Sequence, residues 1–213
     1  MKKTREVGLE FSEENEKAFY RIYGRIIATE PNKVSGDCPS TMCFADADFA
    51  GCSVSLRSTS GSIMYHRGMP IVWSSKKQTL RALSTCESEY VALFDTIRMS
   101  KMSGFLDFFL ESGKIPLTFT DNMSALSLSK SSLVSKRSKH IDLRYHEIRD
   151  HAKDLAYVPT SRNLADPLTK GLVSEKYISL FRHTEDGDDA GRPGDVECLE
   201  ATVMSCYASA IFN

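Results

Sequence analysis

The segment Thr41-Met-Cys-Phe-Ala-Asp46 decides the fold, because it is a short apolar run that ends in an acid and opens a series of similar segments. Such a run is typical of a buried strand. Two more strand-like segments follow at 60–66 and 70–74, and a turn at Arg67-Gly68-Met69 separates them. We therefore predict an antiparallel meander of three strands.

Downstream of the meander, helix-like and strand-like segments alternate. A long helix is predicted from Leu83 to about Glu111, where Ser84-Thr-Cys-Glu87 matches a capping box and Gly113 is a stop signal. The other predicted elements are a strand at 115–120, a helix to about 130, a helix at 140–153, a strand at 155–158, helices from Asn163 and near 174–182, and an early helix at 13–27. This order indicates an α/β fold in which helices cover a mixed sheet.

The composition is that of an ordinary globular chain, with 213 residues, 41% hydrophobic and 26% charged. This length fits one domain with extensions, or two small domains. No apolar run approaches the ~20 residues of a membrane span, and no apolar segment follows the basic N-terminus, so we expect an intracellular protein without a membrane partner. The six cysteines form no C-x-x-C pair, which favours reduced thiols over a zinc ribbon.

The net charge of −1 conceals an asymmetry along the chain. Residues 184–213 hold seven acids and one base, which leaves 26 basic and 21 acidic residues in 1–183. Residues 49–86 and 122–141 contain basic residues and no acid. Two such stretches suit a face that binds a polyanion, although a solvated basic face with its counter-charges elsewhere explains them equally well.

Two predicted core strands end in an aspartate, Asp46 and Asp121. If these strands are parallel neighbours, both carboxylates emerge at the sheet edge where α/β proteins bind ligands. Paired carboxylates raise one pKa or hold a cation, and oxygen ligands favour magnesium or manganese over zinc. The alternative is that each aspartate is only a turn former.

Further acids stand at the starts of predicted helices: Glu87 and Glu89 in the long helix, and Asp166 after Asn163. Acids at these positions also complement the positive end of the helix macrodipole. A helical wheel does not separate Glu87 from Glu89, so spacing alone leaves both open.

Eight ordered blocks resemble the ribonuclease H domain of copia-type long-terminal-repeat retrotransposons. They are FADADFAGC (44–52), RSTSG (57–61), WSSKKQ (73–78), ALSTCESEY (82–90), TDNMSAL (120–126), KHIDLRYHEIRD (139–150), YVPT (157–160) and LADPLTKGL (164–172). Together they cover about residues 41–172, and their order and spacing follow the family's pattern.

The resemblance implies a ribonuclease H-like fold, a five-stranded mixed sheet with three antiparallel strands followed by two parallel ones and flanking helices. It divides the chain into an extension at 1–40, similar to the segment after a reverse-transcriptase domain, and a ribonuclease H-like domain at 41–182. The acidic tail at 183–213 resembles nothing in the family and is expected to be disordered.

The resemblance also implies four catalytic, metal-binding carboxylates: Asp46, Glu89, Asp121 and Asp166. It is this analogy that favours Glu89 over Glu87. In two-metal nucleases such acids hold two Mg²⁺ ions about 3.5–4 Å apart, one activating the attacking water and the other stabilising the leaving oxygen. We expect Asp46 to be shared between the ions and Mn²⁺ to be a substitute for Mg²⁺.

The implied substrate is the RNA strand of an RNA–DNA hybrid, recognised by its shape and its 2′-hydroxyl groups, with salt-dependent phosphate contacts. The parent polyprotein's reverse-transcriptase domain is an implied partner. Cellular ribonucleases H carry a histidine on the loop before the last aspartate, but residues 155–165 contain none. His140 or His146 is a candidate substitute, and the alternative is that both histidines are structural. The candidate nucleic-acid-binding residues are Lys76, Lys77, Asn122, Lys136, Arg137, Lys139 and His140.

Two other functions stay open at this point. The chain is alternatively a catalytically silent remnant that binds hybrid or duplex without cleaving it. The second alternative is a different metal nuclease of the same superfamily, such as a transposase or a junction resolvase, but the KHID and LAD…TK blocks argue against it.

Overall fold

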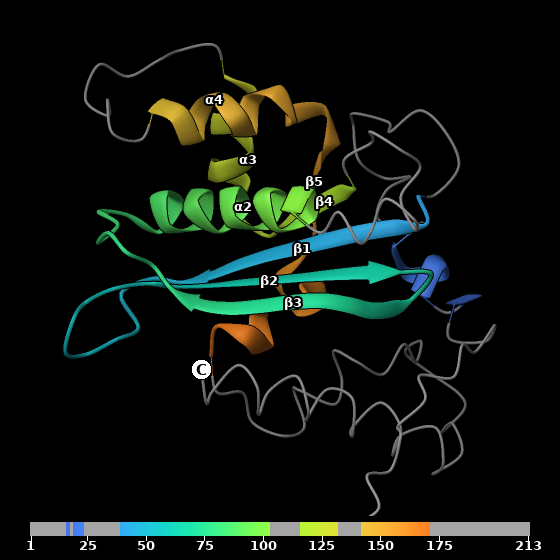
Figure 1. Cartoon of the computed structure of the whole chain (residues 1–213), viewed down its shortest axis with the longest axis horizontal. Coiled ribbons are helices and arrows are strands. Elements are labelled where there is room, and N and C mark those ends of the chain that lie inside the picture. The colour runs from blue at the N-terminus through green and yellow to red at the C-terminus, as the bar shows by residue number, and fades with distance from the viewer. Residues whose placement is uncertain (1–15, 18, 24–38, 103–115, 132–141, 171–213) are drawn as a thin grey trace, which may run out of the picture.

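One mixed sheet of five strands, in the order β3-β2-β1-β4-β5, organises the molecule (Figure 1). The computed structural model describes residues 16–17, 19–23, 39–102, 116–131 and 142–170. The strands are β1 (Thr41–Asp48), β2 (Thr59–His66), β3 (Met69–Lys77), β4 (Leu117–Thr120) and β5 (Leu155–Tyr157). β1, β2 and β3 are antiparallel, whereas β4 is parallel to both β1 and β5. The predicted fold class is therefore confirmed.

The turn between β2 and β3 consists of Arg67 and Gly68, as predicted. Both residues have positive φ angles, 49° and 80°, which is the conformation of a type I′ hairpin turn. Glycine adopts it freely, whereas Arg67 is held by Glu16, whose carboxylate oxygens accept hydrogen bonds of 2.7 and 2.9 Å from its guanidinium group. This pair ties the N-terminal segment to the end of the sheet.

The long helix α2 spans Thr85–Met102, the last described residue before a gap, so its predicted end near 111 lies outside the described residues. Its start resembles the predicted capping box. Ser84 Oγ accepts from the Glu87 N–H at 3.1 Å, and Glu87 Oε2 accepts from the Leu83 N–H at 2.7 Å. The second bond reaches one residue before the cap, which ties the preceding loop to the first turn.

The helices α2, α3 (Met123–Lys130) and α4 (Asp142–Asp150) lie on one face of the sheet (Figure 1). Side chains alternate along β1, so that Ala45 and Ala47 pack toward α2 while Met42 and Phe44 pack into the opposite core. The 3-10 turns η3 (Thr160–Arg162) and η4 (Asp166–Leu168) follow β5, and η4 crosses the opposite face. The sheet is thus covered on both sides.

An aromatic cluster fills the core on the face opposite α2. Phe44 stacks on Phe119 with ring centroids 5.1 Å apart, and Phe19 stacks on Tyr65 at 5.3 Å. Tyr23 meets Phe44 edge-on at 5.0 Å, and its hydroxyl donates to the Arg162 carbonyl. Residues 16, 17 and 19–23 are helical, so this segment of the expected helix contributes two rings to the core. The predicted domain division, which assigns it to an extension, stays a prediction.

The helix predicted from Asn163 is wrong for the described residues, since the chain there makes only the 3-10 turn η4. Pro167 has no N–H, and it stands where the first i→i−4 bond of a helix beginning at Asn163 would need a donor. Asn163 to Thr169 are all buried, so the segment has no solvent face of the kind an amphipathic helix presents. The helix expected near 174–182 and the tail at 183–213 lie outside the described residues.

The other predicted helix, at 140–153, corresponds to α4 and the 3-10 turn η2 (Ala152–Asp154). No helix among the described residues is long and apolar enough to cross a membrane.

We predict that Phe19→Ala lowers the free energy of unfolding by about 3–5 kcal/mol, because a buried ring leaves a cavity in the aromatic cluster. Urea unfolding followed by circular dichroism measures this loss. The matched control is Leu83→Ala, which truncates a side chain that is 89% exposed and changes stability by at most about 0.5 kcal/mol. Equal, small effects in both variants would show that the N-terminal segment does not pack in the core.

Candidate active site

The parallel pairing of β1 with β4 brings two aspartates to one edge of the sheet. The register ends with Ala45 opposite Thr120, and Asp46 and Asp121 are the next residues on the two strands. Asn122 then caps α3, its side-chain oxygen accepting from the Ala125 N–H at 2.9 Å, so the chain turns away directly after Asp121. The expected juxtaposition of these two carboxylates is present.

The third acid is Glu89, from the second turn of α2. One carboxylate oxygen from each of Asp46, Glu89 and Asp121 lies within 4.8 Å of the others. Glu89 is buried and accepts a hydrogen bond from the backbone of Ala47. Glu87 instead caps the helix, outside this group. We call Asp46, Glu89 and Asp121 the three-acid cluster.

Polar contacts fix the start of α2 against β2, and thereby position Glu89. Gln78 Nε2 lies 3.0 Å from Ser60 Oγ and 2.9 Å from the Ser88 carbonyl oxygen, with all three groups buried. Two turns further along, the hydroxyls of Ser62 and Thr96 are 2.7 Å apart. These buried bonds set the rotation of the helix, so that residue 89 and not residue 87 faces the strand ends.

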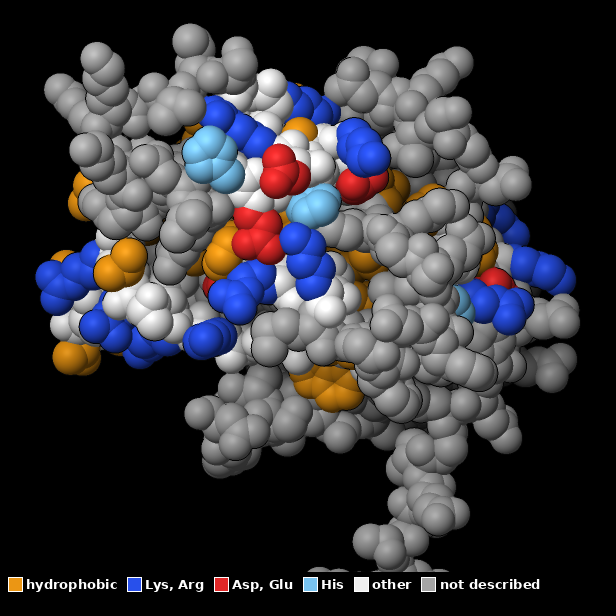
Figure 2. Space-filling model, turned by 45° about the horizontal axis from the view of Figure 1, so that its top comes forward, with side chains coloured by type: hydrophobic (Ala, Val, Ile, Leu, Met, Phe, Trp, Pro, Cys, Tyr) orange, Lys and Arg blue, Asp and Glu red, His pale blue; other side chains and the backbone are white. Residues whose placement is uncertain are grey.

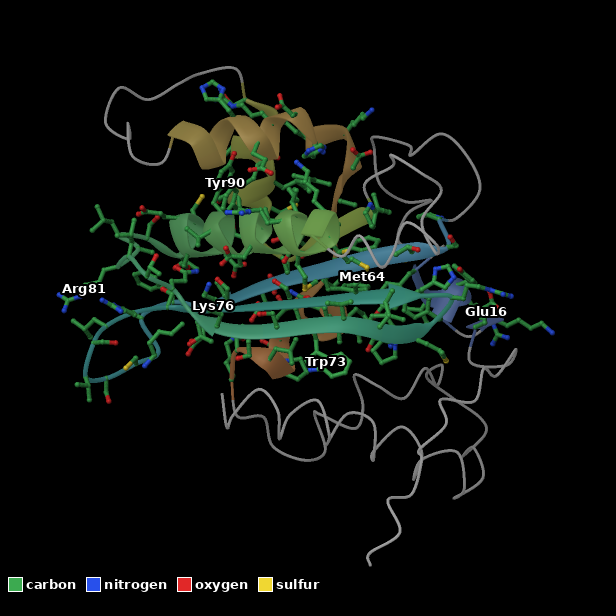
Figure 3. All side chains as sticks on the ribbon, in the orientation of Figure 1. Glu16, Met64, Trp73, Lys76, Arg81 and Tyr90 are labelled. Atoms are coloured by element: carbon green, nitrogen blue, oxygen red, sulfur yellow. The ribbon has the colours of Figure 1, made fainter. Side chains whose placement is uncertain are left out.

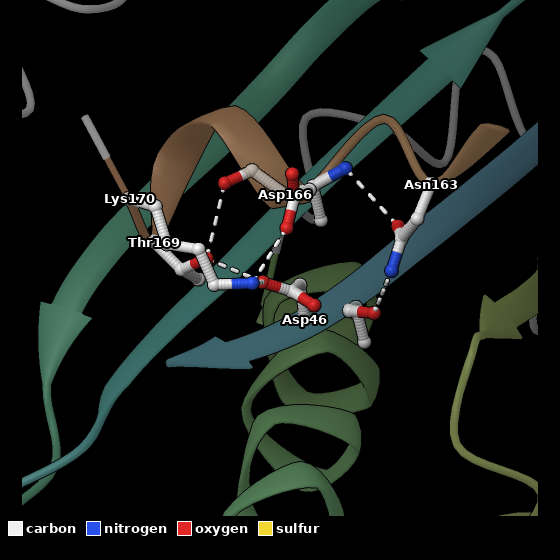
Figure 4. A network of polar contacts seen from close by, with 7 residues as sticks. Asp46, Asn163, Asp166, Thr169 and Lys170 are labelled. Carbon is white, nitrogen blue, oxygen red and sulfur yellow. Dashed lines mark hydrogen bonds and ion pairs between the residues drawn. The ribbon is translucent and has the colours of Figure 1, made fainter. Parts of the chain in front are cut away.

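The fourth acid, Asp166, is fully buried in η4 and reaches the site from the opposite face of the sheet (Figure 4). Asn163 holds this turn: its Nδ2 donates to the Ala45 carbonyl at 3.0 Å and its Oδ1 accepts from the Ala165 N–H. η4 also passes close to Gly61, the β2 partner of Asp46. A Cβ atom at position 61 would lie 2.7 Å from Thr169 Cγ2 and 2.8 Å from the Ala165 carbonyl oxygen.

Two residues that the sequence did not single out complete the site. Lys170 Nζ lies 2.7 Å from Asp166 Oδ1 and 4.0 Å from Asp46 Oδ2 (Figure 4). The Thr169 hydroxyl lies within hydrogen-bonding distance of both Asp46 Oδ2 and the Asp166 carbonyl oxygen. The available signal was the i,i+4 spacing of Asp166 and Lys170, which is typical of ion pairs on helical segments.

Burial and mutual repulsion disturb the protonation of these acids. Burial raises the pKa of Asp46 to about 6, although Thr169 and Lys170 oppose the shift. Burial, reinforced by the charges of Asp46 and Asp121, raises the pKa of Glu89 to about 9. The buried Glu89 Oε2 atom has no hydrogen-bond partner among the described residues. A divalent cation would supply both the missing partner and the missing positive charge, so the donor set fits Mg²⁺ or Mn²⁺.

Basic side chains gather near this edge of the sheet (Figure 2). Lys76 and Lys77 are exposed at the end of β3, and they pair across β2 with Ser60 and Thr59, the partners of Ala47 and Asp48. Figure 3 shows Lys76 and Arg81 at one end of the molecule and Glu16 at the other. Of the other predicted nucleic-acid contacts, Asn122 caps α3, while Lys136, Arg137, Lys139 and His140 lie outside the described residues. His146 is exposed on α4.

A mixed sheet of this order, with one acid near the end of its first strand, one directly after its fourth strand in the chain and a third on the helix that follows the meander, defines a ribonuclease H-like protein. No family model matches the chain. It is 36% identical over 155 residues to the retrovirus-related Pol polyprotein from transposon TNT 1-94 of Nicotiana tabacum, which covers 67% of this chain and 12% of the polyprotein. It is 35% identical over 173 residues to that from transposon RE1 of Arabidopsis thaliana, covering 76% of this chain and 12% of the polyprotein.

Over the matched residues the chain belongs to the retrovirus-related Pol polyproteins of copia-type transposons, as its sequence blocks predicted. It spans about an eighth of the length of these relatives. Among solved structures, the N-terminal RNase H domain of Rv2228c from Mycobacterium tuberculosis, determined as a fusion with maltose-binding protein, is similar with a TM-score of 0.46 and 12% identity. That likeness covers 61% of this chain and 89% of the solved one.

We predict that, in EDTA, the free energy of unfolding falls as the pH rises from about 5 to about 9. The folded protein keeps protons on Asp46 and Glu89 that the unfolded chain has released in this range, so raising the pH favours unfolding. Each such proton contributes a slope of about 1.4 kcal/mol per pH unit.

Urea unfolding at a series of pH values measures this slope. Glu89→Gln should make it shallower, whereas Glu147→Gln, which removes an acid paired with Lys101 away from the cluster, should keep it. A slope as steep in Glu89→Gln as in the unsubstituted protein would contradict the assigned burial of the Glu89 charge.

Proposed function

We propose that this chain is a metal-dependent ribonuclease H that hydrolyses the RNA strand of RNA–DNA hybrids endonucleolytically. The observation that carries the proposal is the three-acid cluster at the end of the β1–β4 pair, with Asp166 connected to Asp46 through Lys170 from the other face of the sheet. Membership in the Pol polyproteins supports it, since reverse transcription leaves RNA paired with DNA.

In this proposal, Asp46, Glu89, Asp121 and Asp166 hold two Mg²⁺ ions, with Mn²⁺ as a substitute. The bound ions supply Lewis-acid stabilisation of phosphoryl oxygens and a water of lowered pKa. Asp46 is the candidate shared ligand, because it is close to Glu89 and Asp121 on one side and lies near Lys170, the partner of Asp166, on the other. Glu89 keeps its proton near neutral pH, and Asp46 keeps one below about pH 6. These protons must leave when a cation binds, so metal affinity should rise with pH.

The exposed bases beside the site are the proposed contacts for the substrate backbone. Lys76 and Lys77 lie at the end of β3, and Arg57 and Arg81 stand on the loops next to that strand end. The two loops adjoin, since the Gln78 N–H donates to the Ser58 carbonyl at 2.8 Å. Basic side chains next to a carboxylate site can bind the phosphates of a nucleic-acid strand. Such binding would place the scissile phosphodiester bond of that strand beside the acids. The reverse-transcriptase domain of a parent polyprotein is the proposed partner, and it would extend the contact with the RNA–DNA hybrid.

We predict that the protein in Mg²⁺ or Mn²⁺ cleaves the RNA of a labelled RNA–DNA hybrid and leaves RNA–RNA and DNA–DNA duplexes intact. Asp46→Asn should reduce the cleavage rate by at least about 10³-fold, in line with the effect of removing a group that stabilises the transition state. Asp95→Asn, which removes an acid from α2 away from the cluster, serves as the matched control and should retain activity.

Each contrary outcome has a separate meaning. Hybrid binding without cleavage by the unsubstituted protein would favour the silent remnant. Cleavage of DNA junctions but not of hybrids would favour another nuclease of the superfamily. Cleavage that survives Asp46→Asn would show that the acids described here are not the catalytic ones.

We further predict that Lys76→Ala together with Lys77→Ala weakens hybrid binding without sequence preference. Loss of two phosphate contacts should lower the slope of log K against log salt by about 2. Fluorescence anisotropy at several salt concentrations measures this slope. Lys153→Ala together with Lys130→Ala removes the same charge from the other side of the molecule as a control, and an equal change in both double variants would show a general charge effect only.

A further inference from the structure

The acids of the site form two groups that share Asp46, and positive charge is not distributed equally between these groups. Between Asp46 and Asp166 stands an ammonium group, Lys170 Nζ, at 4.0 and 2.7 Å from their oxygens. The other group is the three-acid cluster. There, Lys170 is the weakest of the influences on the pKa of Glu89, and the buried Glu89 Oε2 has no hydrogen-bond partner among the described residues.

The side chain of Lys170 can move away from the acids more easily than the side chains around it. Its side chain is 42% exposed, whereas Asp166 and Asp46 are 0% and 2% exposed. A lysine is a compact cation on a flexible four-carbon stem, so it can withdraw into water without a change in the backbone. Asn163 and Thr169 meanwhile hold η4 on β1 through contacts that do not involve the ammonium group.

We propose that Lys170 is an internal competitor for divalent cations, so that the two ions of the site bind with unequal affinity. The inference rests on the proposed function. The first ion binds the three-acid cluster, where Lys170 Nζ pairs only with Asp46, at 4.0 Å, a longer contact than its 2.7 Å pair with Asp166. The second binds between Asp46 and Asp166 only by displacing Lys170 Nζ, which is tethered beside the carboxylates at a high effective concentration.

The proposal also gives Lys170 a position after displacement. The stem is anchored next to the acids, so the released ammonium group stays at the rim of the site, where it can pair with a substrate phosphate. Binding of the second ion would then be favoured by substrate, because the phosphate offers Lys170 an alternative partner to Asp166. Lys170 acts in this scheme as a positioning residue that sets metal occupancy.

The test is a titration of the whole protein with Mn²⁺ alone, without nucleic acid, in which calorimetry and the electron paramagnetic resonance of free Mn²⁺ count the bound ions. The unsubstituted protein should bind one ion more tightly than the second. Lys170→Met keeps the stem and removes the charge, and it should tighten the second ion by about tenfold or more, the size of one lost charge-assisted contact. The affinity of the first ion should change less than that of the second, because Lys170 Nζ is 4.0 Å from Asp46 but 2.7 Å from Asp166.

Two controls separate the competition from a general charge effect. Lys101→Met removes an ammonium group of similar exposure, 40%, that pairs with Glu147 at 2.9 Å on another part of the surface, and both affinities should stay unchanged. Lys170→Arg keeps the positive charge and should keep the second ion weak. Lys170→Gln also removes the charge and should tighten the second ion, so the test survives if Lys170→Met does not fold.

The outcomes distinguish the two proposals. Unequal sites that become similar in Lys170→Met support the competition, whatever the cleavage assay shows. Two sites whose affinities are the same in the unsubstituted protein and in Lys170→Met overturn the competition and leave the proposed nuclease intact. Failure of the unsubstituted protein to bind any Mn²⁺ overturns both.

Discussion

The parallel pairing of β1 with β4 is the constraint on which the rest of the structure depends. It carries Phe44 and Phe119 into one aromatic core, and two residues later it places Asp46 and Asp121 side by side. The same register therefore stabilises the fold and brings like charges together. Hydrophobic burial holds the two strands together despite the repulsion between the two carboxylates.

The elements around this pair offset the repulsion to different degrees. α2 adds a third carboxylate, Glu89, whose burial worsens the deficit of positive charge. η4 adds a fourth acid but also brings Lys170 and the Thr169 hydroxyl against Asp46. The site is thus neutralised on the η4 side and left short of charge on the α2 side. This imbalance makes divalent cations its natural complement.

Features that depend on close neighbours in the chain were predictable from the sequence. The turn at Arg67 and Gly68 and the cap at Ser84 follow from local chemistry. Asp121 directly follows β4 as predicted, whereas β1 continues two residues past Asp46, to Asp48. The choice of Glu89 over Glu87 needed the family resemblance, because it depends on how buried bonds from β2 rotate α2. The contact of Thr169 with Asp46 was not predictable, because 123 residues separate the two in the chain. For Lys170, only its i,i+4 spacing from Asp166 was available, and that spacing does not reveal the contact with Asp46. The 3-10 turn η4 was not predicted, because the burial of residues 163–169 depends on the tertiary fold and not on the local sequence.

Gly61 has a consequence for reading related genes. η4 can lie on β2 only because position 61 bears no side chain, and even a methyl group would push against Thr169 and the Ala165 carbonyl. A copy of the gene that encodes alanine or valine there would keep every acidic codon and yet hold Asp166 away from the other three acids. An inventory of the acidic codons alone would therefore miss this change in the position of Asp166, and the codon for this glycine belongs in the same inventory.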